Sequence, residues 1–327
     1  MQLTIQQARE LAEATMTAVG HSDDEAAIIA DHLIDCELRG LSFGGLPRAL
    51  SVVDRLREHD QRRPIQVLQE TPATASLDGG DQVGYLVGAR ATDIAIEKAR
   101  VTGIAAVGAS KTWYTGMFSY YLERVARAGF VGMIAGSGGQ KVAPHGGNEG
   151  RFSTNPIAFG FPSEGDPVIW DIGTASVMLG EVMLKKRLGE PLAPGLAFNR
   201  AGDPTLDPGE ALEGAFTVWG GHKGSGLSMT IQLLAMMAGQ ATVPQSLRDC
   251  GFFITVFNPE LFTPPGDFRR RVSEYAAMLR ATRPVNPDQP VRVPFERSAA
   301  ERTRRLAANI VDVDERIYAQ LQDLTCK

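Results

Sequence analysis

Residues 85–134 read YLVGARATDIAIEKARVTGIAAVGASKTWYTGMFSYYLERVARAGFVGMI, and this stretch decides the fold class. Apolar residues recur at helical spacing over Tyr85–Arg100 and again over Met117–Ala128. A short apolar run with strand composition follows each of them, at Ile104–Val107 and at Phe130–Ile134. Helices that alternate with strands are typical of α/β folds, so the stretch predicts an α/β domain.

The same reading extends to the rest of the chain. Residues 64–77 are expected to be extended, and further strands are predicted over Pro156–Phe161, Val168–Ile172 and Phe252–Phe257. Helices are predicted over Thr4–Val19, from Ser22 to near Gly40, over Leu46–Arg57, Ser176–Leu188, Ser225–Ala238, Asp267–Arg283 and from Asp312 to Leu324. Ser22 and Glu25 have the spacing of a capping box, which marks the start of the second of these helices.

Composition limits the class of protein. The chain has 327 residues, of which 43% are hydrophobic and 22% are charged, as in ordinary soluble proteins. A net charge of −5 argues against nucleic acid as the main partner, because phosphate binding draws on clustered basic residues. The basic clusters Arg269–Arg271 and Arg302–Arg305 lie in helix-like stretches and are interpreted as solvated faces.

Neither a membrane nor a metal is indicated. The amphipathic N-terminal residues do not resemble a signal peptide, and no apolar run reaches transmembrane length, so we expect a cytoplasmic protein. Cys36, Cys250 and Cys326 form no CxxC pair, and no histidines and acids have metal-ligand spacing. His21, His32 and His59 lie on predicted helices or at their ends and indicate no site.

The Rossmann dinucleotide fingerprint is missing. No GxGxxG motif follows a strand and opens a helix. The sequence GSGG at Gly136–Gly139 does follow a predicted strand, but Lys141 and Pro144 after it indicate a loop. A Rossmann site is therefore the less favoured alternative.

Five segments resemble one known family. Arg39–Arg48 reads RGLSFGGLPR and resembles, without insertion, the RGxxSHGxxR segment of the malate/L-lactate dehydrogenase type 2 family. Four more segments match the family's motifs in the same order: STNPIAFGFP (Ser153–Pro162), DIGTASVMLGE (Asp171–Glu181), APGLAFNRAGDPTLDP (Ala193–Pro208) and GGHKGSGLSM (Gly220–Met229). The chain is identified as a member of this family, which includes sulfolactate, ureidoglycolate and diketogulonate dehydrogenases and piperideine-2-carboxylate reductases.

The resemblance implies an architecture. We expect an α/β, non-Rossmann nicotinamide-binding fold with a mixed, mostly antiparallel sheet and a helical unit formed by the N- and C-terminal segments. This predicts a terminal domain of residues 1–63 together with 284–327, and a nicotinamide- and substrate-binding domain of residues 64–283. It also implies a homodimer with the active site near the subunit interface.

The substrate site keeps one of the family's residues and lacks two. Arg48 falls on the Arg that holds the substrate carboxylate, and a guanidinium matches the two oxygens of a carboxylate. Phe43 and Gly44 stand where the family has its catalytic Ser and His, so the pocket is expected to be larger and more apolar. Thr154 falls on a substrate-contacting Thr, although a Thr entering a strand before Asn155-Pro156 is the plainer interpretation.

Another group would have to supply the proton. The segment TWYTGMFSYY (Thr112–Tyr121) resembles the family's SxHxGxxxYY, with Tyr114 on the His, so Tyr114 is a donor or an aromatic wall. Glu181 falls on a relay Asp of the piperideine-carboxylate reductases, or is an ordinary acid in the first turns of a helix. His145 and His222 are alternative acid/base groups, and water is a third source of the proton.

The cofactor candidates form three groups. Thr115, Gly116 and Met117 make a turn beside Tyr114, and the triplet of Asp171, Ile172 and Gly173 ends a strand. Gly221, Lys223 and Gly224 open a helix, where backbone N–H groups and a Lys charge suit a phosphate. The cofactor is expected to be NAD or NADP. Gly138 and Asn199 depart from the family pattern.

These residues predict an NAD(P)-dependent oxidoreductase. Its substrate would be a small 2-oxo, 2-hydroxy or cyclic 2-imino carboxylate, bulky or aromatic because of the reshaped pocket. The alternative is a catalytically silent member that binds ligand or cofactor without turnover.

Overall fold

A seven-stranded sheet forms the centre of the protein, whose computed structural model describes residues 1–244 and 250–325. In sheet order the strands are β2 (Gln66–Glu70), β3 (Thr74–Val83), β4 (Ile104–Trp113), β10 (Cys250–Phe257), β5 (Val131–Ser137), β6 (Ile157–Phe161) and β7 (Val168–Ile172). The β3–β4 pair is parallel and every other neighbouring pair in this sheet is antiparallel. The predicted mixed, mostly antiparallel sheet is confirmed.

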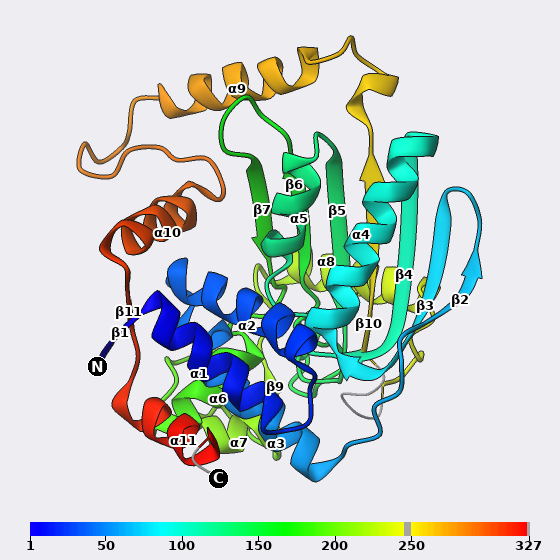
Figure 1. Cartoon of the computed structure of the whole chain (residues 1–327). Helices are drawn as coiled ribbons and strands as arrows, with labels where there is room; N and C mark the ends of the chain where they lie inside the picture. The colour runs from blue at the N-terminus through cyan, green and yellow to red at the C-terminus, as the bar shows by residue number, and fades with distance from the viewer. Residues whose placement is uncertain (245–249, 326–327) are drawn as a thin grey trace.

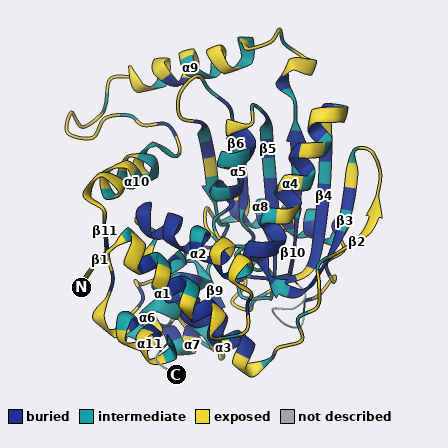
Figure 2. Ribbon diagram, viewed as in Figure 1, coloured by how far each residue is buried: buried dark blue, intermediate teal, exposed yellow. Residues whose placement is uncertain are grey.

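Helices cover both faces of the sheet. On one face, α4 (Gly84–Thr102) and α5 (Phe118–Arg127) bury apolar side chains such as Phe252 and Ile254 (Figure 1). On the other face, α8 (His222–Met237) packs Ile231 against the sheet. Figure 2 shows the central strands as largely buried between these helices.

The two ends of the chain meet in a helical unit. Its helices are α1 (Ile5–Thr17), α2 (Asp23–Leu38), α3 (Leu46–Glu58) and α11 (Glu315–Thr325). Strand β1 (Gln2–Thr4) pairs antiparallel with β11 (Ile310–Asp312), and their helices share one apolar core. Capping boxes open α1 and α2, the second being the predicted Ser22–Glu25 pair. The expected union of the N- and C-terminal segments is confirmed.

A small unit lies beside the sheet and the helical unit. It contains α6 (Leu179–Leu188), α7 (Pro208–Glu213) and the short antiparallel pair β8 (Ala197–Phe198) with β9 (Ala215–Phe216). Fully buried Phe216 and Val182 belong to its apolar core. Two 3₁₀ turns, η1 (Ser42–Gly44) and η3 (Pro259–Leu261), complete the connections described here.

Helices α9 (Asp267–Arg280) and α10 (Glu296–Ala308) lead the chain back to the helical unit (Figure 1). Here the interpretation of Arg302–Arg305 as a solvated face is wrong in part. Arg302 pairs with Asp35 at 2.6 Å, and Arg305 donates to the Glu37 carbonyl at 3.0 Å. These two arginines fix α10 to α2, whereas Arg269–Arg271 are exposed as expected.

Several predicted boundaries were wrong by a few residues. Helix α9 ends at Arg280 and not Arg283, because Pro284 disfavours helical backbone before it. Helix α8 begins at His222, since Gly221 adopts a φ of 60° as its N-cap, and α6 begins only after Met178. Residues 64–77 contribute to two paired strands, and β4 continues to Trp113 because it pairs on both sides. Cys326 lies outside the described residues.

Candidate active site

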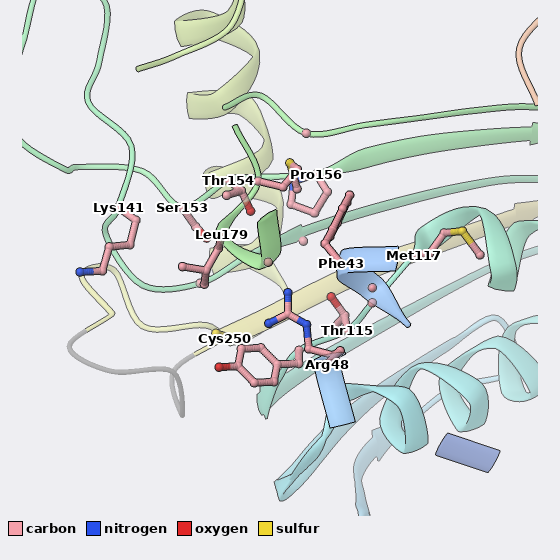
Figure 3. Close-up of a pocket in the computed structure, with 18 of the residues that line it drawn as sticks. Phe43, Arg48, Thr115, Met117, Lys141, Ser153, Thr154, Pro156, Leu179 and Cys250 are labelled. Carbon is pink, nitrogen blue, oxygen red and sulfur yellow. The ribbon is translucent and has the colours of Figure 1, made fainter. Parts of the chain in front are cut away.

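A cavity of about 700 Å³ opens where the helical unit, the sheet and the small unit meet. Its walls come from the turn before α3, the β4–α5 turn, the β5–β6 loop, the start of α6 and the start of β10 (Figure 3). The predicted residues that line it are Phe43, Gly44, Arg48, Tyr114, Thr115, Gly116, Met117, Thr154, Asp171 and Gly173. The fold therefore brings together segments that are far apart in the sequence.

Arg48 projects into this cavity from the first turn of α3. Its guanidinium lies over the ring of Tyr114, 4.7 Å from the ring centroid, and Nη1 lies 3.6 Å from the sulfur of Met183. No carboxylate among residues 1–244 and 250–325 forms an ion pair with Arg48. Gly180 makes room for the guanidinium, since a Cβ there would collide with it. A half-buried Arg without an internal carboxylate is a ready receptor for an anion.

The turn before Arg48 is held from behind by Glu37. The buried Glu37 carboxylate accepts a hydrogen bond from the Leu46 N–H at 2.7 Å, at the start of α3. Its side chain also fills the space where a Cβ on Gly45 would stand. Burial raises the pKa of Glu37 to about 7. This contact fixes the origin of α3 and with it the position of Arg48.

Phe43 and Gly44 form the cavity wall next to Arg48. A Cβ on Gly44 would lie 3.3 Å from the Cys36 sulfur, and a Cβ on Gly180 would lie 3.0 Å from the Phe43 ring. The wall is therefore closely packed on its inner side. Toward the cavity it offers an aromatic ring and a bare backbone.

Tyr114 forms the floor beneath Arg48. It adopts a left-handed φ of 51°, and its ring meets Trp113 edge-on at 5.4 Å. Its hydroxyl lies 4.0 Å from the Met183 sulfur. Burial raises the pKa of Tyr114 although Arg48 opposes the effect, so the phenol stays protonated at neutral pH.

His32 supports the turn of Thr115, Gly116 and Met117 from below. Its Nε2 accepts the Met117 N–H at 2.9 Å, and a Cβ on Gly116 would collide with the imidazole. The ring is buried against the rings of Tyr85, Tyr120 and Tyr121. Burial lowers the pKa of His32 to about 3, so the ring is neutral and carries its hydrogen on Nδ1. Sequence reasoning missed His32, because a lone His on a helix gives no signal.

Asp171 is already engaged by the protein. Its carboxylate accepts the Ser119 N–H at 2.7 Å, at the first turn of α5. Burial raises the pKa of Asp171 to about 6, although hydrogen bonds from Ser119 and Phe118 oppose this effect. Asp171 thus anchors the start of α5 and also lines the cavity, while Ile172 packs toward α8. Gly173 lacks room for a Cβ because Met178 lies against it.

The remaining predicted residues lie outside the lining of the cavity. Glu181 is half-buried in the first turn of α6, next to the lining residue Gly180. His145 and His222 are exposed, with ring centroids 6.3 Å apart at the start of α8. Gly221, Lys223 and Gly224 occupy the same end of α8, where the first N–H groups have no partner within the helix.

The cavity is also lined by residues for which no role was predicted from the sequence. The most distinctive is Lys141, a half-buried cation on the β5–β6 loop. Cys36, Met178, Leu179, Met183 and Cys250 add further apolar or sulfur-bearing surface. In the sequence, Lys141 indicated only a loop after GSGG, and no ligand contact was predicted for it. Nothing in the described part of the chain gathers three or more metal-ligating side chains.

Comparisons with known proteins agree with this geometry. The family model for malate/L-lactate dehydrogenase matches residues 3–322. The chain is 29% identical to L-sulfolactate dehydrogenase of Methanothermobacter thermautotrophicus, over 98% of this chain and 95% of the relative. It is 33% identical to malate dehydrogenase of Pyrococcus abyssi, over 82% of this chain and 79% of that relative. The crystal structure of a dehydrogenase from Sinorhizobium meliloti superposes with a TM-score of 0.91 at 29% identity, covering 99% of this chain and 98% of that one.

The mixed, mostly antiparallel sheet and its superposition on a solved dehydrogenase define an α/β dehydrogenase fold that is not of the Rossmann type. The chain belongs to the malate/L-lactate dehydrogenase family. Dehydrogenases of this family use nicotinamide cofactors, so the protein is an enzyme of the NAD(P)-dependent class. Within the part of the chain that the structure describes, no helix is long and apolar enough to cross a bilayer.

Proposed function

We propose that the protein transfers a hydride between a nicotinamide cofactor and C2 of a small 2-oxo, 2-hydroxy or cyclic 2-imino carboxylate. The observation that carries this proposal is Arg48, whose guanidinium faces the cavity without a carboxylate partner among the described residues. Burying a cation without an anion is costly, and a substrate carboxylate offsets that cost. Relatives named for malate and sulfolactate dehydrogenation act on acids of this kind.

The cavity fits a nicotinamide cofactor in its chemistry. Thr115, Gly116 and Met117 of the β4–α5 turn line the cavity, as do Asp171 and Gly173 at the end of β7. Gly136, Gly138 and Gly139 line it as well, which allows close approach of a flat ring. Gly221, Lys223 and Gly224 at the start of α8 would hold phosphate. When bound, the cofactor supplies or accepts the hydride.

The protein's part is to hold the substrate and manage one proton. Arg48 would bind the carboxylate and Thr154 would assist it, while Phe43 and Gly44 leave an apolar space for a bulky or aromatic side chain. Tyr114 lies under Arg48 and is protonated at neutral pH, so it can donate a hydrogen bond to an oxo group. Glu181 does not line the cavity, so it could influence the proton transfer only through a residue that does. His145 is exposed outside the cavity lining, so it could donate the proton only after a movement of the β5–β6 loop.

The alternative function is binding without turnover, and one experiment separates the two. Calorimetric titration with NADH and with NADPH should give heat for at least one of them. Oxidation of that cofactor is then followed with a panel of 2-oxo and cyclic 2-imino acids. If the cofactor binds but is not oxidised with any acid of the panel, the protein binds ligand without turnover. If neither cofactor binds, both the oxidoreductase and the cofactor-binding function are contradicted.

Tyr114→Phe decides between the proton sources. If Tyr114 donates the proton, the variant should keep its Michaelis constant and lose kcat on oxo acids. If kcat stays intact, water, His145 or His222 supplies the proton. An imine that enters already protonated should be reduced equally by both forms, because it needs no acid.

We further propose that residues 1–63 with 284–327 act as a terminal domain, that residues 64–283 carry cofactor and substrate, and that the protein is a cytoplasmic homodimer. The shared apolar core of the chain ends supports the first point. An exposed apolar stripe on α8 supports self-association.

A further inference from the structure

Lys141 occupies a fixed position on the cavity wall. Its backbone N–H donates to the Phe152 carbonyl at 2.6 Å, and its carbonyl accepts the Phe216 N–H at 2.7 Å. The first bond lies within the β5–β6 loop, and the second ties the loop to Phe216 in the core of the small unit. The side chain therefore leaves a rigid backbone, although the loop itself has no regular secondary structure.

The ammonium of Lys141 has no acidic partner among the residues that the structure describes. Its side-chain hydrogen bond goes to the Leu212 carbonyl, and no acid in residues 1–244 or 250–325 lies within ion-pair distance of it. Burial lowers the pKa of Lys141, while the charge of Glu213 opposes this effect only from a distance. An ammonium has three N–H donors, so one bond to Leu212 leaves two for a ligand.

The cavity thus holds two cations at separate places. Figure 3 shows the side chain of Lys141 well separated from the Arg48 guanidinium, with Ser153 and Leu179 between them in the view. The one acid among the described lining residues is Asp171, which is bound to the first turn of α5. Two cations without an acidic partner among the described residues, in a single cavity, match a ligand with two anionic groups.

We propose that Lys141 recognises a second anionic group, a carboxylate or sulfonate, at the far end of an extended substrate whose C1 carboxylate is held by Arg48. Lys141 is then a specificity-determining residue that selects 2-oxo or 2-hydroxy diacids by chain length. This inference rests on the proposed function of Arg48. The apolar surface between the cations, provided by Leu179 and Met183, suits the methylene chain of such a diacid.

A phosphate of the cofactor is the competing ligand for Lys141. Thr115 and Met117, which belong to the proposed cofactor turn, lie on the other side of Arg48 from Lys141 in Figure 3. This placement separates Lys141 from that turn, whereas Gly138 and Gly139, which are also proposed to line the cofactor site, lie close to Lys141 in the sequence. The experiment below distinguishes the two ligands by their separate kinetic constants.

The test compares Lys141→Met with the wild type on two series of substrates. The first series is 2-oxo dicarboxylates of four to seven carbons, and the second is the straight-chain 2-oxo monocarboxylates of the same lengths. At the preferred length, Lys141→Met should lower kcat/KM for the diacid about 10- to 100-fold, the range expected for one charge-assisted contact. Activity on the monoacids should change less than about twofold, since they never reach Lys141.

Two further variants make the result interpretable. Lys141→Arg keeps the charge and should keep most of the preference for the diacid. Lys186→Met removes a lysine charge from an exposed position on α6 outside the cavity lining and should match the wild type. Thermal unfolding of all variants shows whether the loss of the Leu212 contact alone has loosened the fold.

Three outcomes would overturn the inference. One is equal loss on both series, which indicates a structural role. Another is a raised KM for the cofactor with an unchanged ratio of diacid to monoacid, which assigns Lys141 to a cofactor phosphate. The third is a wild type that neither turns over nor binds any diacid. Should turnover be absent, calorimetric binding of the diacid to wild type and Lys141→Met decides the role of Lys141 independently of the proposed reaction.

Discussion

At the scale of single residues, the site is built from cations and neutral hydrogen-bonding groups placed against apolar walls. Arg48 stacks on Tyr114 and meets only a methionine sulfur, whereas most other arginines of the described chain are paired with acids. Such a residue costs stability when the cavity is empty. It is therefore placed for a ligand.

Replacing Arg48 by Ala should weaken substrate binding and leave the cofactor unaffected. Loss of one charge-assisted, two-pronged contact costs on the order of 1.5–3 kcal/mol, or about 10- to 100-fold in the Michaelis constant. Steady-state kinetics with the best acid of the panel measures this. Arg57→Ala is the matched control, because Arg57 lies exposed on the same helix. Unchanged kinetics for Arg48→Ala would remove Arg48 from the site.

His32 offers a second prediction at this scale. His32→Leu leaves the Met117 N–H without its acceptor, so the turn of Thr115–Met117 should lose its fixed position. We expect a higher KM for the cofactor with little change in the KM for the acid. His32→Gln places an amide oxygen near the position of Nε2 and should restore the wild-type value. A loss of kcat without any change in cofactor KM, not rescued by Gln, would point to a different role.

At the scale of elements, the α2–α3 connection links the helical unit to the cavity. Glu37 near the end of α2 holds the first N–H of α3, and Arg305 of α10 donates to the Glu37 carbonyl. Ionising a buried carboxylate costs free energy, and for this reason burial raises the pKa of Glu37. The stability of this junction should therefore depend on pH.

The sign follows from the direction of the pKa change. Glu37 has a pKa of about 7 in the folded protein and an ordinary value of 4.5, so the folded state holds the proton more tightly. Its contribution to stability is present below pH 4.5 and is lost as pH rises through 7. Glu37→Gln keeps an oxygen for the Leu46 N–H but cannot ionise. Relative to the wild type it should gain on the order of 3 kcal/mol between pH 4.5 and pH 8.

Urea unfolding at several pH values measures this difference. Glu58→Gln provides the control, since Glu58 is exposed at the end of α3. If the free energies of Glu37→Gln and the wild type run parallel from pH 5 to pH 8, the folded and unfolded states bind the Glu37 proton equally, and burial does not raise the pKa of Glu37.

Elements and site residues differed in how well the sequence predicted them. The helices around Ala91 and Leu33 were predicted because their apolar residues repeat at 3.6-residue spacing and pack on one core. The ends of α8 and α9 were misplaced by a few residues, because glycine and proline backbone preferences decide them locally. Arg48 and Tyr114 were predicted through motifs. His32 and Lys141 were not, because each becomes significant only through partners distant in the sequence, Met117 and Leu212.

At the scale of the whole molecule, α8 leaves an apolar stripe uncovered. Met229, Leu233 and Met237 recur every fourth residue and are 57%, 51% and 65% exposed. Trp219, just before α8, is 51% exposed as well. Exposed apolar stripes of this kind are typical of protein interfaces, and the opposite side of α8 already packs on the sheet.

We therefore expect a homodimer in solution that uses this stripe. Leu233→Glu places a charge in the middle of it and should shift the protein to the monomer, because an unpaired charge is costly to bury. Light scattering coupled to size exclusion measures the mass of each form. Val101→Glu is the matched control, since Val101 is an exposed apolar residue at the end of α4. If Leu233→Glu keeps the wild-type mass, or if the wild type is a monomer, the α8 stripe does not join two copies.

Because α8 also begins with the proposed phosphate contacts, the monomer should bind the cofactor less tightly, and titration of Leu233→Glu with that cofactor tests whether assembly and binding are linked.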